Sequence, residues 1–181
     1  DLSHVQKLDL SWNENTDAGL AVLVGTGPLP QLRHLVLNAN QIGDEGAKSL
    51  ALSKNLPNLE TVELVNNHVA DFGALSLVKS QSLLSLWAID LEMNKVGQKK
   101  LTRFPDGAVV SKLRELNLRR NVVSDESLAD WAQAGAFEKL VQLNLGWNQI
   151  TDQGARILAN SPTLSQLEVL VLDSNYIGDP G

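Results

Sequence analysis

The sequence predicts a single α/β domain, a curved solenoid with seven parallel strands on its concave face and helices on its convex face. Two observations predict this fold. The segment before each unit's asparagine alternates aliphatic and polar residues as a strand does, and helical spacing follows it. The asparagine itself recurs every 27 residues without a slip, at Asn13, Asn40, Asn67, Asn94, Asn121, Asn148 and Asn175. Residues 1–181 therefore read as one domain of stacked units.

The strands are expected in the eight residues that precede each asparagine. These segments read VQKLDLSW, LRHLVLNA, LETVELVN, LWAIDLEM, LRELNLRR, LVQLNLGW and LEVLVLDS. Their first, fourth and sixth letters are always Leu, Val or Ile, so one side of every strand faces an aliphatic core. The asparagine then lies where the strand turns outward. Its amide can pair backbone N–H and C=O groups that would otherwise be buried without a partner.

The helices are expected after an aspartate that lies four residues beyond most of the asparagines. Aspartate is a preferred helix N-cap, because its carboxylate accepts hydrogen bonds from the exposed amides of the first turn. Apolar residues follow at helical spacing, and Trp131 falls on the face that points to the core. A strand–helix–strand unit of this kind gives parallel strands with a right-handed crossover. The aspartates are Asp17, Asp44, Asp71, Asp125, Asp152 and Asp179.

The consensus L-x-x-L-x-L-x-x-N-x-I-x-D-x-G-A resembles the leucine-rich repeat family. The long unit with its helical segment resembles the ribonuclease-inhibitor-like class of that family. The string QGARILANSPTLSQLEVLVLDSNYIGDPG is similar to tandem repeats of large bacterial proteins. The resemblance covers essentially the whole chain. It implies a horseshoe-shaped domain and a protein-binding role, and it implies no particular ligand.

Four positions depart from the consensus. Asn15 replaces the usual Ile or Val, Gln98 replaces the aspartate of the fourth repeat, and Lys100 and Ser127 replace glycines. We interpret these changes as drift on a convex surface that tolerates substitution.

The two ends show no polar caps of the kind that close a solenoid. Only residues 1–4 precede the first strand segment, and the sequence stops at Gly181, where the seventh unit should enter its helix. We therefore expect a fragment of a longer array, whose uncapped terminal repeats can self-associate through open sheet edges.

Composition narrows the classes of partner and compartment. The net charge of −6 argues against general nucleic-acid binding, and no apolar run is long enough to span a membrane. There is no cysteine and no N-glycosylation acceptor, so a cytoplasmic location is expected. A basic band separates two acidic flanks, and we interpret it as solvated surface. Besides the paired arginines of the fifth strand segment, it contains Lys95, Lys99, Lys100, Arg103, Lys112 and Arg114.

The third, fifth and seventh letters of each strand segment should point out of the concave face, with the eighth at its rim. Two tryptophans occupy rim positions where packing requires no aromatic ring, and aromatic and Arg side chains are enriched at interface hot spots. The alternative is that each ring covers neighbouring apolar surface. Acidic and basic residues also lie side by side, and Glu92 with Arg119 could form a simple cross-strand ion pair. The candidate partner-binding residues are Trp12, Glu63, Asp90, Glu92, Met93, Arg119, Arg120, Trp147 and Asp173.

Catalytic chemistry is not indicated. His4, His34 and His68 belong to different units, and the sequence has no GxxxxGK[ST], GxSxG or cysteine nucleophile. Glu63, Asp90 and Glu92 could hold a hard cation, but the neighbouring Arg119 competes for their carboxylates. The sequence thus favours a non-enzymatic protein-recognition module without cofactor or metal. The alternatives are a structural spacer and a regulator of a partner GTPase.

Overall fold

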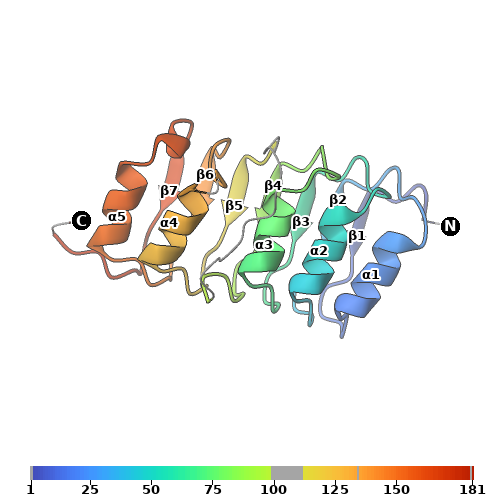
Figure 1. Ribbon diagram of the computed structural model, residues 1–181. Coiled ribbons are helices and arrows are strands. Elements are labelled where there is room, and N and C mark those ends of the chain that lie inside the picture. Colours follow the sequence, from blue (N-terminus) through green and yellow to red (C-terminus); the bar gives the residue numbers. More distant parts are fainter. Residues whose placement is uncertain (1, 99–111, 134, 180) are drawn as a thin grey trace.

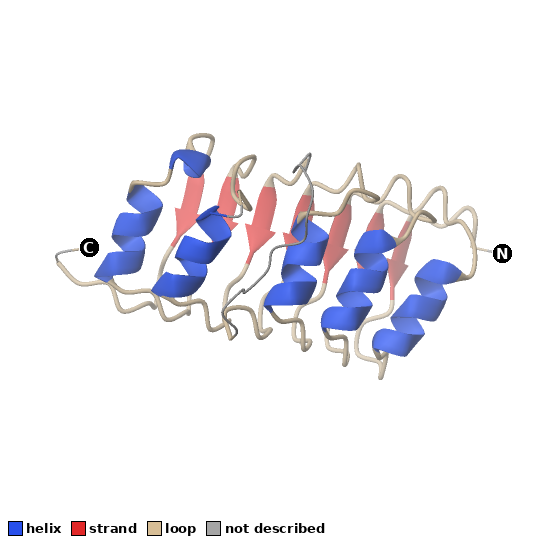
Figure 2. Ribbon diagram, viewed as in Figure 1, coloured by secondary structure: helices blue, strands red, loops and turns tan. Residues whose placement is uncertain are grey.

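The computed structural model describes residues 2–98, 112–133, 135–179 and 181. The described strands are β1 (Lys7–Asp9), β2 (His34–Val36), β3 (Thr61–Glu63), β4 (Ala88–Asp90), β5 (Glu115–Asn117), β6 (Gln142–Asn144) and β7 (Val169–Val171). The described helices are α1 (Asp17–Gly25), α2 (Asp44–Leu52), α3 (Asp71–Val78), α4 (Asp125–Gln133), α5 (Asp152–Ala159) and the short 3-10 helix η1 (Pro162–Leu164). The α-helices line one side of the sheet and leave its other face open (Figures 1 and 2). None of the described helices has the length and apolar character needed to cross a bilayer.

The sheet follows the chain order from β1 to β7, and every neighbouring pair is parallel. Leu8 pairs with Leu35, which pairs in turn with Val62, so the register advances by one repeat at each strand. Equivalent residues of successive repeats therefore stack in columns across the sheet. This arrangement confirms the predicted α/β solenoid of seven parallel strands.

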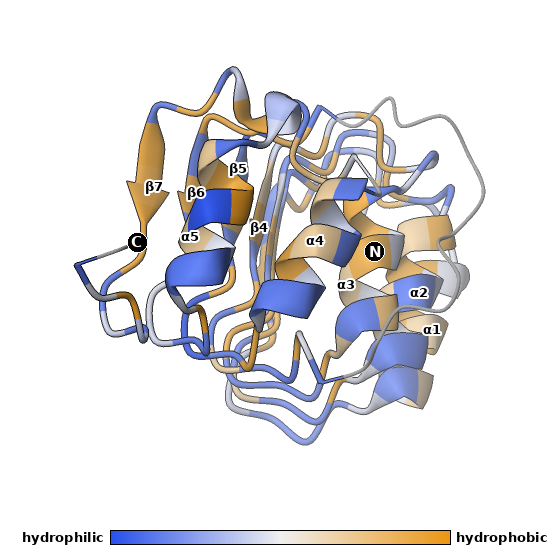
Figure 3. Cartoon of the chain, turned by 60° about the vertical axis from the view of Figure 1, so that its left-hand side comes forward, coloured by the Kyte–Doolittle hydropathy of each residue, from blue (hydrophilic) through white to orange (hydrophobic). Residues whose placement is uncertain are grey.

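The core lies between the sheet and the helix layer. The fourth and sixth strand letters fill it, and Leu37, Leu64 and Leu91 are fully buried. Trp131 is buried and stacks on Phe137 with ring centroids 6.2 Å apart, which confirms its predicted place in the core. Burial falls at the sheet's last strand, where Leu170 is 39% exposed. Figure 3 shows β7 as a hydrophobic strand at the C-terminal end of the sheet.

The repeated asparagines join each repeat to the one before it. Asn67 Nδ2 donates to Leu64 O in its own repeat at 3.1 Å and to Leu37 O in the preceding repeat at 2.9 Å. Its Oδ1 accepts from Ile42 N of the preceding repeat at 3.0 Å. The amide thus satisfies buried backbone groups, as predicted. Two of these hydrogen bonds join neighbouring repeats, and the third closes the turn within one repeat. The same pattern recurs at Asn40, Asn94, Asn121, Asn148 and Asn175.

The repeated aspartates do not cap their own helices, and that prediction was wrong. The aspartates that start α1 to α5 are each the first residue of their helix, and the residue before takes the N-cap position where one is assigned, as Gly43 does for α2. The carboxylate instead accepts a hydrogen bond from the next repeat. Asp44 Oδ1 accepts from Ala70 N at 2.8 Å and from Gly73 N at 2.9 Å at the start of α3. The helix N-terminus still receives a negative charge, but from its neighbour.

The glycine two residues after most of the aspartates permits this close approach. A Cβ at Gly73 would lie 2.7 Å from Asp44 Oδ1 and 2.8 Å from Asp44 Cα. Ser127 occupies this position in the fifth repeat, and the residue of the fourth repeat that corresponds to Asp44 is Gln98. At the junction of the fourth and fifth repeats, Gln98 therefore replaces the carboxylate that leaves no room for a side chain at the glycine position elsewhere. The two departures from the consensus are thus physically linked.

The fourth repeat differs from its neighbours at its start. Asp71 Oδ1 accepts from Gly97 N at 2.9 Å, so the aspartate of the third repeat still holds the chain that follows the fourth strand. A helix was predicted here, but its span falls mostly on residues outside the described ranges. Lys99, Lys100 and Arg103 of the basic band also lie outside the described residues.

Candidate partner-binding face

The open face of the sheet is hollowed into a shallow groove of about 440 Å³. The third and fifth strand letters form its floor, because they point away from the helix layer. The groove runs across the strands from β3 to β7 rather than along them. A ligand lying in it would contact one or two residues from each of five repeats.

The chemical character of the groove changes along its length. The fifth letters run from Glu63 and Asp90 through Asn117 and Asn144 to Val171. The third letters run from Thr61 and Ala88 through Glu115 and Gln142 to Val169. The groove is therefore acidic over β3 to β5, carries amides over β5 and β6, and is aliphatic at β7.

The fifth letter also closes the end of its strand. Asp90 Oδ1 accepts from Glu92 N at 2.9 Å, and Asn117 and Asn144 accept in the same way from the residues two further on. Burial raises the pKa of Asp90, and the negative charges of Glu92 and Glu63 add to this effect against the hydrogen bonds from Glu92 N and the Asn117 side chain. Asp90 is thus a carboxyl in acidic surroundings that the groove does not neutralise.

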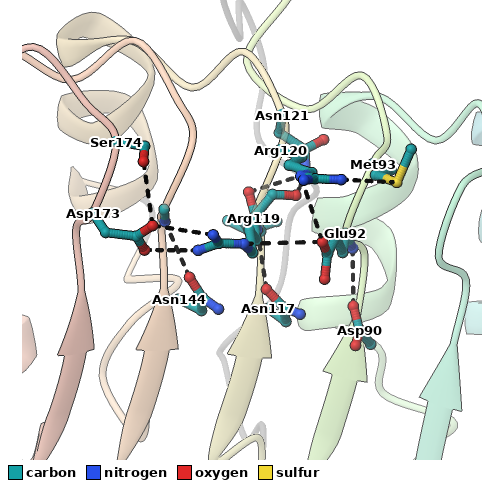
Figure 4. A network of polar contacts seen from close by, with 12 residues as sticks. Asp90, Glu92, Met93, Asn117, Arg119, Arg120, Asn121, Asn144, Asp173 and Ser174 are labelled. Carbon is teal, nitrogen blue, oxygen red and sulfur yellow. Dashed lines mark hydrogen bonds and ion pairs between the residues drawn. The ribbon is translucent and has the colours of Figure 1, made fainter.

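A network of charged side chains borders the groove where the strands end (Figure 4). The Arg119 guanidinium binds both carboxylate oxygens of Asp173, with Nη1–Oδ1 at 2.6 Å and Nη2–Oδ2 at 3.0 Å. These residues are two repeats apart, and Gly146 occupies the equivalent position between them. A Cβ at Gly146 would collide with both partners, so the glycine makes the bridge possible. The hydrogen bond from Arg119 lowers the pKa of Asp173.

Glu92 lies beside both arginines of this network. Its Oε1 is 4.0 Å from Arg119 Nε and 4.0 Å from Arg120 Nε. The ion pair of Glu92 with Arg119 that the sequence suggested is therefore present, but it is longer than the contact of Arg119 with Asp173. Asp173 binds Arg119 through two short hydrogen bonds and is its main partner.

The rim residues at the eighth letter share an unusual backbone conformation. All seven, from Trp12 to Ser174, have φ between 53° and 57°, which non-glycine residues adopt only at a cost of about 1 kcal/mol or more. The N–H groups of the six rim residues from Trp12 to Trp147 nevertheless continue the inter-strand ladder, as when Trp147 N donates to Asp173 O at 2.8 Å. The ladder therefore holds the rim side chains in fixed positions.

The two rim tryptophans have different surroundings. The Arg120 guanidinium lies 5.1 Å from the centre of the Trp147 ring, a cation–π geometry, and its Nη1 lies 4.0 Å from Met93 Sδ. Trp147 is 50% exposed in this cluster. Trp12 is 83% exposed after the edge strand β1, so its ring covers little apolar surface.

The structure brings most of the sequence-predicted residues together. Glu92, Met93, Arg119, Arg120, Trp147 and Asp173 form one rim cluster, and Glu63 and Asp90 lie in the adjoining groove. Trp12 is remote from both, at the other end of the sheet. Among the described residues no group of three His, Cys, Asp or Glu side chains could hold a metal ion.

Sequence reasoning selected only Glu63 and Asp90 among the residues that line the groove, and it missed its other polar residues, its valines and Trp87. Glu115, Gln142, Asn117 and Asn144 stand in columns that point outward, and reading each column as a gradient would have found them. Trp87 stands at the second letter, which we had not treated as part of the face, but it lines the groove beside β4.

Comparisons with known proteins support the repeat architecture. Residues 1–24, 30–51, 111–129 and 138–159 match the family model described as Leucine Rich repeat. An internalin (inlF) from Listeria monocytogenes has a similar structure, with a TM-score of 0.65 and 23% identity over 99% of this chain and 44% of that one. Listeria monocytogenes InlP is also similar, with a TM-score of 0.54 and 20% identity over 95% of this chain and 38% of that one. No curated protein matches the sequence.

These likenesses have a limited meaning. At such low sequence identity, the structural similarity shows a shared fold and no more. The chain spans less than half of either internalin structure.

Proposed function

We propose, from the premise that this chain is a leucine-rich repeat protein, that it recognises a partner protein through the open face of its sheet and the adjoining rim. The leucine-rich repeat fold suggests a protein-interaction module. The proposal further assigns the contact to the groove and to the rim cluster of Glu92, Met93, Arg119, Arg120, Trp147 and Asp173.

One observation carries this assignment. Arg120 and Trp147 are held against each other on the rim, are largely exposed, and border a groove that no part of the described chain fills. Tryptophan and arginine are the residue types that contribute most often to interface hot spots. Their backbone is fixed by the sheet ladder, so little conformational freedom would be lost on binding.

The proposal treats the protein as non-enzymatic. The groove is shallow and open, whereas catalytic sites are usually enclosed enough to exclude water from the reacting groups. A purely structural spacer is the competing reading. It predicts that rim substitutions change no interaction of the protein.

The test compares two pairs of substitutions that remove the same kind of contact. The first variant carries Arg120→Glu and Trp147→Ala on the rim. The control carries Lys48→Glu and Phe72→Ala, because Lys48 Nζ lies 5.5 Å from the centre of the Phe72 ring on the helix side. Each protein, checked for folding by circular dichroism, is used to capture partners from an extract of the source cell, and the affinity of each captured protein is then measured with purified components.

We expect the rim variant to bind the partner at least about tenfold more weakly, a loss of about 1.4 kcal/mol. The helix-side control should bind like the native protein. Equal losses in both variants, or equal binding by all three proteins, would remove the assignment to the sheet face.

A further inference from the structure

We propose that the groove receives an extended segment of the partner that carries a basic side chain and, four residues away, an aliphatic one. This inference rests on the proposed function and specifies the chemistry of the partner. The basic side chain would lie over the acidic end at β3 to β5. The aliphatic side chain would lie over Val169 and Val171 at β7.

The acidic end offers a place for a cation that the protein itself does not fill. Glu63, Asp90 and Glu115 line it, and no Lys, Arg or His is among the described residues that line the groove. Arg119 and Arg120, at the ends of the strands, contact Asp173, the Trp147 ring and Glu92, and neither lines the groove. Among the described residues, Glu63 Oε2 accepts one side-chain hydrogen bond, at 2.9 Å from the neutral Asn38 Nδ2.

The surroundings of Asp90 also favour a cation. Burial and two nearby carboxylates raise the pKa of Asp90, so its charged form is held at a cost in the free protein. A basic side chain placed beside it would relieve that cost. Trp87 lines the same end and is 37% exposed, and tryptophan is the side chain that attracts a guanidinium or ammonium group most strongly.

The middle and far end of the groove suit the remainder of such a segment. Asn144 uses its Oδ1 to accept from Gly146 N, which leaves its amide NH2 group to donate to a peptide carbonyl. Gln142 carries a second side-chain amide on the same strand. Beyond them Val169 is 43% exposed, an apolar surface that an aliphatic side chain would cover.

The spacing of the two ends selects an extended segment. From β4 to β7 there are three strand steps, or about 14 Å at about 4.8 Å for each step. Four residues of an extended chain span about 13 Å, and their even spacing puts both side chains on one face. The same four residues in a helix span only about 6 Å. An extended segment lying across the strands therefore reaches both ends.

The probe is a fluorescein-labelled nonapeptide of glycine and serine with arginine at its third position and leucine at its seventh. In one control peptide glutamate replaces the arginine, and in another the leucine moves to the sixth position, which faces the other way. Binding is measured by fluorescence anisotropy. The groove variants are Asp90→Asn and Val171→Thr, and Glu126→Gln on the outer surface of α4 is the control.

Both groove variants preserve local structure. Asn117 and Asn144 already make the strand-end hydrogen bond that Asp90 makes, so asparagine at residue 90 keeps that bond while it removes the charge and one of the two acceptor oxygens. Threonine has the shape of valine and a high preference for strands. Thermal unfolding of each variant verifies that it folds.

We expect the arginine–leucine peptide to bind at least about tenfold more tightly than either control peptide, with an affinity that falls as salt is added. Asp90→Asn should weaken it about fivefold to tenfold, Val171→Thr about threefold, and Glu126→Gln not at all. Equal affinity for the arginine and glutamate peptides, or no binding of the arginine peptide at about 1 mM, would overturn the inference.

This test and that of the proposed function can fail separately. If the rim variant loses the captured partner while Asp90→Asn and Val171→Thr keep it, the recognition function stands and the groove inference is wrong. If the rim variant keeps the partner, the proposed function fails at its own site.

Discussion

The column of repeated asparagines and the fifth column of the strands share one 27-residue period, yet they differ in every other respect. The asparagine column is uniform, because each amide completes backbone groups of two neighbouring repeats. The fifth column varies from Asp9 through Glu63 and Asn144 to Val171, since its side chains lie on the open face of the sheet. Contacts between repeats therefore fix some positions and leave others open to variation. The face that we propose for recognition belongs to the second set.

Replacing a residue of the uniform asparagine column should have the largest effect on stability. Asn121→Ala would leave Val96 N buried without its partner, and it would remove one of the two asparagine donors at each of the carbonyls of Leu91 and Leu118. We expect a loss of about 3 kcal/mol in the free energy of unfolding, measured by urea denaturation. Asn13 bonds only within its own, exposed repeat, so Asn13→Ala should cost under about 1 kcal/mol. Similar losses in the two variants would contradict a role in joining repeats.

A substitution at the aspartate–glycine junction should have the next largest effect. In a solvent-exposed helix, glycine to alanine stabilises by up to about 1 kcal/mol. Gly73→Ala should instead destabilise by about 2 kcal/mol, because the new Cβ meets the backbone and carboxylate of Asp44.

Ser127→Ala serves as the matched position, since the preceding repeat has Gln98 in place of the aspartate. We expect it to change the free energy of unfolding by less than about 1 kcal/mol. If Gly73→Ala proved stabilising in the same denaturation series, the close approach of α2 and α3 would not be what requires glycine.

A change in the varied fifth column should have the smallest effect on stability, and it should stabilise the protein rather than destabilise it. Burial raises the pKa of Asp90 above 3.8, so its ionised form lowers the stability of the folded protein. This penalty is absent below the unfolded pKa, grows as the pH rises through the folded pKa, and is complete above it. Asp90→Asn should therefore raise the melting temperature slightly at pH 7 and leave it unchanged near pH 3. A lower melting temperature at pH 7 would show that the charge is stabilised by contacts the carboxyl makes.

The sequence was sufficient to predict the strands, the asparagine column and the aliphatic core, because these depend on spacing within one unit. It misassigned the role of Asp44, whose nearest helix N-terminus in sequence is its own but whose partner belongs to the next repeat. The link between Arg119 and Asp173 also escaped prediction, since it skips a whole repeat. Its signal was Gly146, a missing side chain in a column otherwise filled. The left-handed backbone of the rim could not be predicted from residue type, because Trp, Ala, Met and Arg all occupy these positions and none of them is glycine.

The two sets of inter-repeat bonds point in opposite directions along the chain. An aspartate such as Asp44 serves the repeat that follows it, whereas an asparagine such as Asn67 serves the repeat that precedes it. An internal unit that has both residues, as the second and third repeats do, cannot come loose without depriving both neighbours of hydrogen bonds. Such reciprocal dependence makes the free energy of each interface large compared with that of an isolated unit. Heating should consequently melt the repeats as one cooperative block, with few molecules frayed from either end.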